Sequence, residues 1–185
     1  MDLPIEGQMS GAERDAIQQL VQNVKPCVVA ECGTWYGGGS TLAIIRGLLN
    51  NRKGILYSWE TDEEKYLAAS DSIRRHLPGS DLFVRFFNRD FALDLDWMAS
   101  TSQILLLDGA SDSGATMSYM QAADRLGSPG QYVILHDWDE HKCESVKSTV
   151  ENQTFRSEWD VLLRLESITG MVVLRKGLQK MGVED

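Results

Sequence analysis

Apolar and polar positions alternate along the chain in blocks that predict strands separated by helices. Five apolar runs are short, continuous and rich in aliphatic and aromatic residues, which is typical of buried strands. These strands are predicted over residues 27–32, 54–60, 82–87, 103–109 and 132–137. Helical patterns are predicted over residues 10–24, 39–50, 62–77, 114–126 and 140–152. In the first helix, Ser10 and Glu13 have the spacing of a capping box.

The end of the chain departs from this alternation. Residues 159–167 and 171–176 are two strand-like segments joined by the short connection from Ile168 to Gly170. Such a connection predicts a hairpin, whose strands are antiparallel. We therefore expect an α/β fold with a doubly wound, mostly parallel, seven-stranded sheet that is Rossmann-like and ends in a C-terminal antiparallel hairpin.

Carboxylates stand at or near the carboxyl ends of all five predicted parallel strands. They are Glu31, Glu60, Asp90, Asp108 and Asp137. Doubly wound sheets bind their ligands beyond these strand ends. Repeated acids at one edge of the sheet therefore indicate a binding site.

The segment ECGTWYGGGST, residues 31–41, joins the first strand to the next helix. Its glycines permit positive φ and close approach of a ligand, and the helix that follows favours an anionic group at its N-terminus. It is not a phosphate-binding P-loop because no Lys follows the glycines, and Trp35 interrupts the glycine pattern of dinucleotide sites. A flexible turn without a ligand would need fewer glycines. Glu60, at the end of the second strand, has the place of an acid that accepts hydrogen bonds from ribose hydroxyls.

This loop, Glu60, Asp90, Asp108-Gly109 and the segment PGQYVILHD at residues 129–137 occur in a recognisable order. The ordered set resembles class I S-adenosylmethionine-dependent methyltransferases, in particular the small O-methyltransferase branch that includes the catechol type. The resemblance covers roughly residues 25–176. An NAD(P)-dependent Rossmann oxidoreductase is the alternative, and the C-terminal hairpin and Trp35 count against it.

The resemblance implies S-adenosylmethionine as cofactor and methylation of a hydroxyl on a small molecule. It implies a cofactor-binding methyltransferase domain over residues 25–185. Residues 1–24 form an N-terminal helical segment outside this domain and are the candidate lid. Glu31 would hold the ammonium of the cofactor, Ser40 would help to position its carboxylate, and Glu60 would bind its ribose. The residues that would border the adenine are Thr61, Asp90 and Phe91. The implied cofactor-binding residues are Glu31, Gly33, Thr34, Trp35, Tyr36, Gly37, Ser40, Glu60, Thr61, Asp90, Phe91 and Asp108.

Methylation of a hydroxyl also requires that the hydroxyl lose its proton, so a base or a metal ion assists. His136 is the candidate base, with Asp137 as its catalytic neighbour, although a strand-end histidine also donates to nearby backbone. Asp108 and Asp137 are candidate Mg²⁺ ligands.

Two departures from the family leave this chemistry open. Trp138 stands where the catechol type has Asn, and Ser111 stands where the family often has Lys or His. Asp112 and Asp139 are alternative metal ligands, and a non-catalytic cofactor-binding module is an alternative function. The segment over residues 88–98, which carries three acids, is predicted to form a solvated loop, and a lining of the acceptor cleft is the alternative.

Composition narrows the expected partners. The net charge is −9, with 27 acidic against 18 basic side chains, which disfavours a nucleic-acid partner. No apolar run approaches the roughly 20 residues of a membrane helix, and the polar N-terminus does not resemble a signal peptide. Cys27, Cys32 and Cys143 lack metal or redox spacing, as expected of reduced thiols in the cytoplasm. We expect a cytoplasmic protein without a membrane partner, with a homodimer as one way to complete the acceptor pocket.

Overall fold

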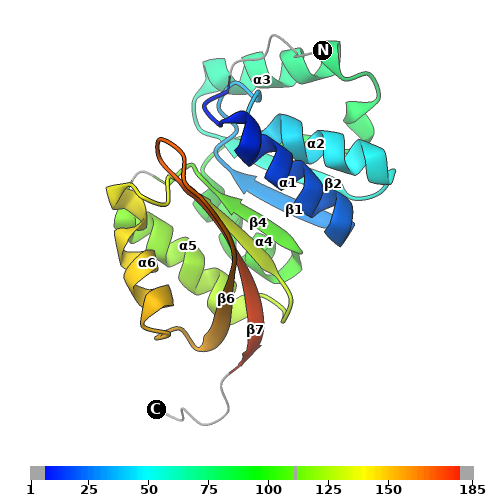
Figure 1. Cartoon of the computed structure of the whole chain (residues 1–185). Coiled ribbons are helices and arrows are strands. Elements are labelled where there is room, and N and C mark those ends of the chain that lie inside the picture. The colour runs from blue at the N-terminus through cyan, green and yellow to red at the C-terminus, as the bar shows by residue number, and fades with distance from the viewer. Residues whose placement is uncertain (1–6, 111, 180–185) are drawn as a thin grey trace. The chain divides into compact units, whose positions relative to one another are not determined.

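The computed structural model describes residues 7–110 and 112–179. The chain forms two compact units, residues 1–93 and 94–185, and helices alternate with strands in both (Figure 1). Among the described residues, no helix has the length and apolar character that crossing a membrane requires.

The first unit contains three strands with their helices. In chain order its elements are α1 (Gly11–Val24), β1 (Val28–Cys32), α2 (Ser40–Asn51), β2 (Ile55–Glu60), α3 (Glu63–His76), η1 (Ser80–Leu82), β3 (Val84–Asn88) and η2 (Phe91–Asp94). The strands are parallel and their order is β3-β2-β1. Glu31 lies opposite Ser58, and Glu60 lies opposite Asn88, so the carboxyl ends of these strands share one edge.

The helices of this unit begin where local polar groups satisfy their free N–H groups. At α1, the backbone N–H of Ser10 donates to Glu13 at 2.8 Å and that of Glu13 donates to the Ser10 hydroxyl at 3.3 Å, which confirms the capping box. At α3, the Asp62 carboxylate accepts from the N–H groups of Glu64 and Lys65. These caps fix where the connecting loops end.

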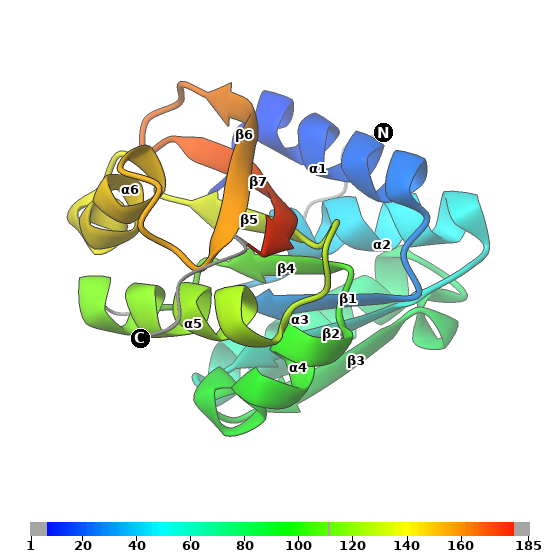
Figure 2. The same cartoon turned by 90° about the horizontal axis from the view of Figure 1, so that it is seen from below.

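Helix α1 lies beside α2, as both views show (Figures 1 and 2). Its residues Ile17 and Val21 are fully buried. Gly47 of α2 permits this close approach, because a Cβ at that position would lie only 2.7 Å from a methyl carbon of Val21. The segment predicted as a lid therefore includes a helix that is packed into the first unit.

The second unit contains the hairpin. Its elements are α4 (Leu95–Thr101), β4 (Ile104–Leu107), α5 (Ser113–Leu126), β5 (Tyr132–His136), η3 (His141–Cys143), α6 (Glu144–Glu151), β6 (Ser157–Leu165) and β7 (Met171–Gln179). The strand order is β4-β5-β7-β6. β4 and β5 are parallel, whereas β7 is antiparallel to both β5 and β6. The predicted α/β fold with a seven-stranded, mostly parallel sheet and a C-terminal antiparallel hairpin is confirmed.

The segment over residues 88–98 is largely exposed, as predicted, but it is not an irregular loop. This segment contains η2 and the start of α4. Met98 and Ala99 are fully buried, and Gln131 donates to the carbonyl oxygen of Ala99 at 2.8 Å. The helix is thus held by a partner 32 residues further along the chain, which its local pattern of acids does not indicate.

Candidate functional site

The glycine loop of the first unit uses backbone conformations that favour glycine. Gly33 and Gly37 have φ of +100° and +82°, and Trp35 has φ of +52°. The N–H groups of Gly33 and Thr34 both donate to the carbonyl oxygen of Trp59, at 3.0 and 3.1 Å. Gly39, the N-cap residue of α2, supplies no side-chain cap to the helix. The N-terminus of α2 therefore offers backbone donors to an anionic group.

Glu31 is a fully buried carboxylate held by hydroxyl groups. It accepts hydrogen bonds from Ser40 at 2.5 Å, Thr41 at 2.7 Å and Ser58 at 2.6 Å. The Thr34 hydroxyl lies 2.5 Å from that of Ser58 and extends this network. Glu31 therefore ties β1, β2 and α2 together and orders the loop. Its predicted contact with a cofactor ammonium, and that of Ser40 with a carboxylate, stay predictions.

Glu60 presents a carboxylate that two backbone groups orient at the end of β2. One oxygen accepts from the N–H of Trp35 at 2.8 Å, and the other accepts from the N–H of Asp62 at 3.0 Å. Each carboxylate oxygen has two acceptor sites, so one hydrogen bond to each still permits contacts with hydroxyl groups. Asn88 donates to the carbonyl oxygens of Glu60 and Thr61 at 3.0 and 3.3 Å. Asn88 is a supporting residue that the sequence analysis missed, since only the pairing of β2 with β3 brings it here.

Trp35 lies in the same loop and has an unsatisfied polar atom. Its indole Nε1 is buried and has no hydrogen-bond partner among the described residues. Lys65 lies 3.9 Å above its ring, and Tyr36 packs edge-on with ring centroids 5.5 Å apart. Buried N–H groups are normally paired, so this donor is open to a partner from outside the described residues.

The predicted adenine-binding residues differ in their exposure. Asp90 is exposed and accepts from the N–H of Ala92 at 2.8 Å. Phe91 is buried and packs edge-on against the buried ring of Trp59, with centroids 5.1 Å apart. Thr61 is exposed in the turn after β2. Phe91 therefore belongs to the core of the first unit, and its contact with adenine stays a prediction.

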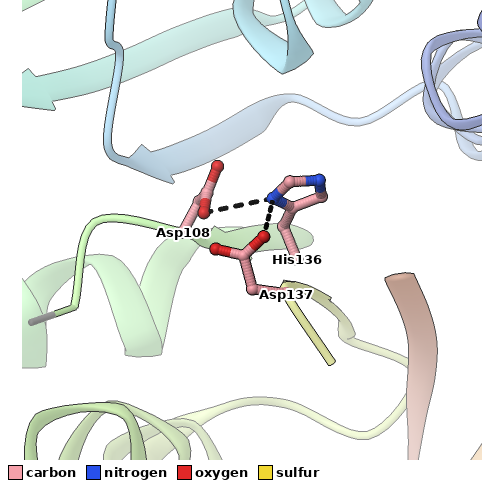
Figure 3. Close-up of side chains that lie close together, drawn as sticks. All are labelled: Asp108, His136 and Asp137. Atoms are coloured by element: carbon pink, nitrogen blue, oxygen red, sulfur yellow. Dashed lines mark hydrogen bonds and ion pairs between the residues drawn. The ribbon is translucent and has the colours of Figure 1, made fainter. Parts of the chain in front are cut away.

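In the second unit, the ends of β4 and β5 bring Asp108, His136 and Asp137 together (Figure 3). His136 Nδ1 lies 3.3 Å from an oxygen of Asp108 and 2.9 Å from one of Asp137. Carboxylates only accept hydrogen bonds, so Nδ1 carries a proton in this arrangement. The His136 side chain is 4% exposed. Asp137 has φ of +57°, a strained conformation for a non-glycine residue, and this turns its carboxylate toward the cluster.

Lys142 is the fourth member of this cluster, and the sequence analysis did not identify it. Its Nζ lies 3.0 Å from the carboxylate of Asp108 and 2.6 Å from that of Asp137. It also donates to the backbone carbonyl of Asp108 at 2.8 Å. Lys142 lies in η3, five positions after Asp137, and no motif spacing marked it.

The charges of the cluster alter the pKa values of its members. Burial lowers the pKa of His136, but its hydrogen bonds to Asp108 and Asp137 outweigh this and raise the pKa to about 10. Burial raises the pKa of Asp137, but hydrogen bonds from His136 and Lys142 hold it well below its ordinary value. Burial raises the pKa of the neighbouring Cys143 thiol to about 11. His136 therefore holds a proton at neutral pH in this state, and its predicted role as base stays a prediction.

The donor atoms of Asp108, His136 and Asp137 lie within 4.8 Å of one another, a spacing that could hold a metal ion. Mg²⁺, however, prefers oxygen ligands, and here one of the three donors is a nitrogen. The carboxylates are also already bound by the side chains of Lys142 and His136. The residues present therefore do not fit Mg²⁺ while Lys142 keeps this position.

The remaining candidates around this cluster have structural contacts. Asp112 caps α5 by accepting from the N–H of Ala115 at 2.9 Å. Asp139 pairs with Lys147 at 3.0 Å and with Arg164 at 2.8 Å. Trp138 is buried, and Ser111 lies outside the described residues.

A family model described as "Methyltransferase domain" matches residues 30–138, which is more than half of the chain. No curated protein sequence matches. Solved structures with the same fold include an assigned O-methyltransferase from Klebsiella pneumoniae, with 17% identity and a TM-score of 0.73 over 94% of this chain and 84% of that chain.

Two other similar structures contain a cofactor or its product. The O-methyltransferase TomG from Streptomyces achromogenes, involved in tomaymycin synthesis and in complex with S-adenosylmethionine, has 16% identity and a TM-score of 0.71 over 92% of this chain and 82% of that chain. An O-methyltransferase from Bacillus cereus in complex with S-adenosylhomocysteine has 21% identity and a TM-score of 0.67 over 94% of this chain and 84% of that chain. At these identities the similarity establishes the fold.

Proposed function

The chain belongs to the methyltransferase-domain family, and we propose that it transfers a methyl group from S-adenosylmethionine to a hydroxyl oxygen of a small molecule. The observation that carries this proposal is the ordered loop of the first unit. There Glu60 presents its carboxylate, and Trp35 presents an indole N–H that has no partner among the described residues. Two proteins of the same fold were solved with S-adenosylmethionine or S-adenosylhomocysteine, and both are O-methyltransferases.

The residues of the loop fit the parts of this cofactor. The carboxylate of Glu60 accepts the ribose hydroxyls, because each of its oxygens has acceptor capacity beyond its backbone contact. The glycines allow close approach of the methionine moiety, and the N-terminus of α2 provides donors for its carboxylate. Glu31 and the hydroxyls around it keep the loop in this conformation, and the negative charge of Glu31 favours the cofactor's ammonium.

Methyl transfer is an in-line displacement, so most of the acceleration comes from orientation. Bound S-adenosylmethionine supplies an electrophilic methyl group. The acceptor oxygen would bond to that methyl carbon while sulfur keeps the electron pair of the carbon–sulfur bond. The hydroxyl proton would pass to His136 in its neutral form or, while His136 is protonated, to water. We propose that Asp108, His136 and Asp137 contact the acceptor hydroxyl, and that His136 acts as a base only in its neutral form.

Other features of the function are also proposals. The acidic balance of the chain supports a small-molecule acceptor over nucleic acid. We place the protein in the cytoplasm, with no membrane partner, and with a homodimer as the assembly. We propose residues 25–185 as the cofactor-binding domain and the preceding segment as a fixed cover, because its helix α1 stays packed on α2.

A thermal shift experiment with two ligands tests this proposal. At a concentration of 100 times its dissociation constant, S-adenosylhomocysteine should stabilise the protein by about 2.7 kcal/mol, which raises Tm by roughly 5–10 °C. NADH serves as the control because it binds the alternative Rossmann oxidoreductases. Stabilisation by NADH and not by S-adenosylhomocysteine would overturn the proposal.

A further inference from the structure

Asp108 and Asp137 form a pair of carboxylates that need a positive charge between them. Their side chains are only 23% and 22% exposed, and both contact the same nitrogen of His136. Two carboxylates this close repel each other, and partial burial weakens the screening by water. A divalent metal ion could supply this charge, but Lys142 already provides a cation here.

The ammonium of Lys142 has three N–H donors and, here, three acceptors. These are the carbonyl oxygen of Asp108 at 2.8 Å, its carboxylate at 3.0 Å and the carboxylate of Asp137 at 2.6 Å. The Lys142 side chain is 18% exposed. We propose that Lys142 is the resident cation of this carboxylate pair and takes the place of a divalent metal ion, so that methyl transfer proceeds without a metal. The statement that methyl transfer needs no metal rests on the proposed function.

The backbone around Lys142 keeps its side chain at this position. The next residue, Cys143, is fully buried, and its N–H donates to the carbonyl oxygen of Glu140 at 3.1 Å. The N–H of Glu140 in turn donates to the carbonyl oxygen of Asp137 at 3.0 Å. Two consecutive hydrogen-bonded turns therefore connect Asp137 to Lys142. A metal ion would have to displace an ammonium that contacts both carboxylates.

Three other cationic side chains of the second unit have partners other than this pair of carboxylates. Lys147 and Arg164 both pair with Asp139. His141 pairs with Glu144 at 2.8 Å, and both of these side chains are largely exposed. The ammonium of Lys142 offsets part of the negative charge of the two carboxylates and so weakens their attraction for a dication. Lys142 acts as a positioning residue, because it orients the carboxylates that contact His136.

Direct measurement of Mn²⁺ binding tests this inference without any acceptor substrate. Mn²⁺ is titrated into the wild type and into Lys142→Met, and free Mn²⁺ is followed by electron paramagnetic resonance. We expect no binding by the wild type at millimolar Mn²⁺ and a gain of at least about tenfold in affinity for Lys142→Met, because one positive charge near the pair is removed. Lys147→Met is the matched control, and it should behave as the wild type.

A second readout uses methyl transfer to a hydroxyl acceptor. EDTA should leave the wild-type rate unchanged, Lys142→Met should lose activity that Mn²⁺ or Mg²⁺ restores, and Lys142→Arg should keep activity without metal. Mn²⁺ binding by the wild type as tight as that of Lys142→Met, no gain of affinity in that variant, or loss of wild-type activity in EDTA would overturn the inference. If the protein binds no S-adenosylhomocysteine, the proposed function fails while the Mn²⁺ titration still decides the place of Lys142.

Discussion

His136 is the residue whose protonation differs most from its ordinary chemistry. Four titratable groups lie close to it: Asp108, Asp137, Lys142 and Cys143. The two carboxylates raise its pKa to about 10, whereas an isolated histidine has a pKa of 6.5. A protonated His136 can carry a positive charge and orient its neighbours, but it must lose its proton before it can act as a base.

This shift predicts how stability depends on pH. The raised pKa means that the contribution of His136 is fully present below pH 6.5 and is lost as the pH rises toward 10. Asp137, with its lowered pKa, contributes above its ordinary value of 3.8 and loses that contribution only in acid. We expect the free energy of unfolding, measured by urea denaturation, to fall between pH 6.5 and 10 more steeply in the wild type than in His136→Asn. Parallel curves for the two proteins would contradict this assignment.

The position of a residue in the fold could be predicted where the chain marks a strand end. Glu31 and Glu60 follow apolar runs directly, so their place at the edge of the sheet could be predicted from the pattern. Lys142 could not be predicted, because it reaches the carboxylates through a turn whose course depends on the positive φ of Asp137. Asn88 was missed for a similar reason, since its contacts depend on strand pairing.

At the scale of elements, the packing of α1 on α2 depends on the absence of a side chain at Gly47. A Cβ there would lie 2.7 Å from Val21, which is fully buried, and neither helix can move away without opening the core. Because the two helices are closely packed, adding even one methyl group between them is expected to lower stability.

We expect Gly47→Ala to destabilise the protein by about 1–3 kcal/mol in chemical denaturation, although alanine favours helices. Gly11→Ala is the matched control, because nothing lies within 4 Å of a Cβ at that position of α1. The control should be neutral or more stable by up to about 1 kcal/mol. Equal effects of the two substitutions would show that α1 does not pack on α2 as described.

The elements that the sequence predicted share a strong local signal, and those that it missed lack one. The first helix has a capping box and a clear apolar face, with Ile17 and Val21 buried as that face requires. Helix α4 has seven residues and no side-chain cap, and contacts from Gln131 hold its C-terminal end. The helix predicted from residue 140 begins as the 3-10 turn η3, and α6 starts only at Glu144.

At the scale of the whole molecule, the alternation of strands and helices was sufficient to predict an α/β sheet, and the short connection at Gly170 was sufficient to predict its antiparallel end. This pattern is shared by several enzyme classes, so the class depends on the loop after β1 and on the acid after β2. The family match over residues 30–138 includes both features.

Calorimetric titration of S-adenosylhomocysteine into the wild type, Glu60→Ala and Glu63→Ala tests the central claim most directly. Glu63 lies three residues away and is exposed in the first turn of α3, so its variant controls for the loss of one negative charge. The wild type and Glu63→Ala should bind with similar affinity. Glu60→Ala should bind roughly tenfold to a hundredfold more weakly, because hydrogen bonds to a charged group are worth about 1.5–3 kcal/mol. Failure of the wild type to bind, or an unchanged affinity for Glu60→Ala, would contradict the account.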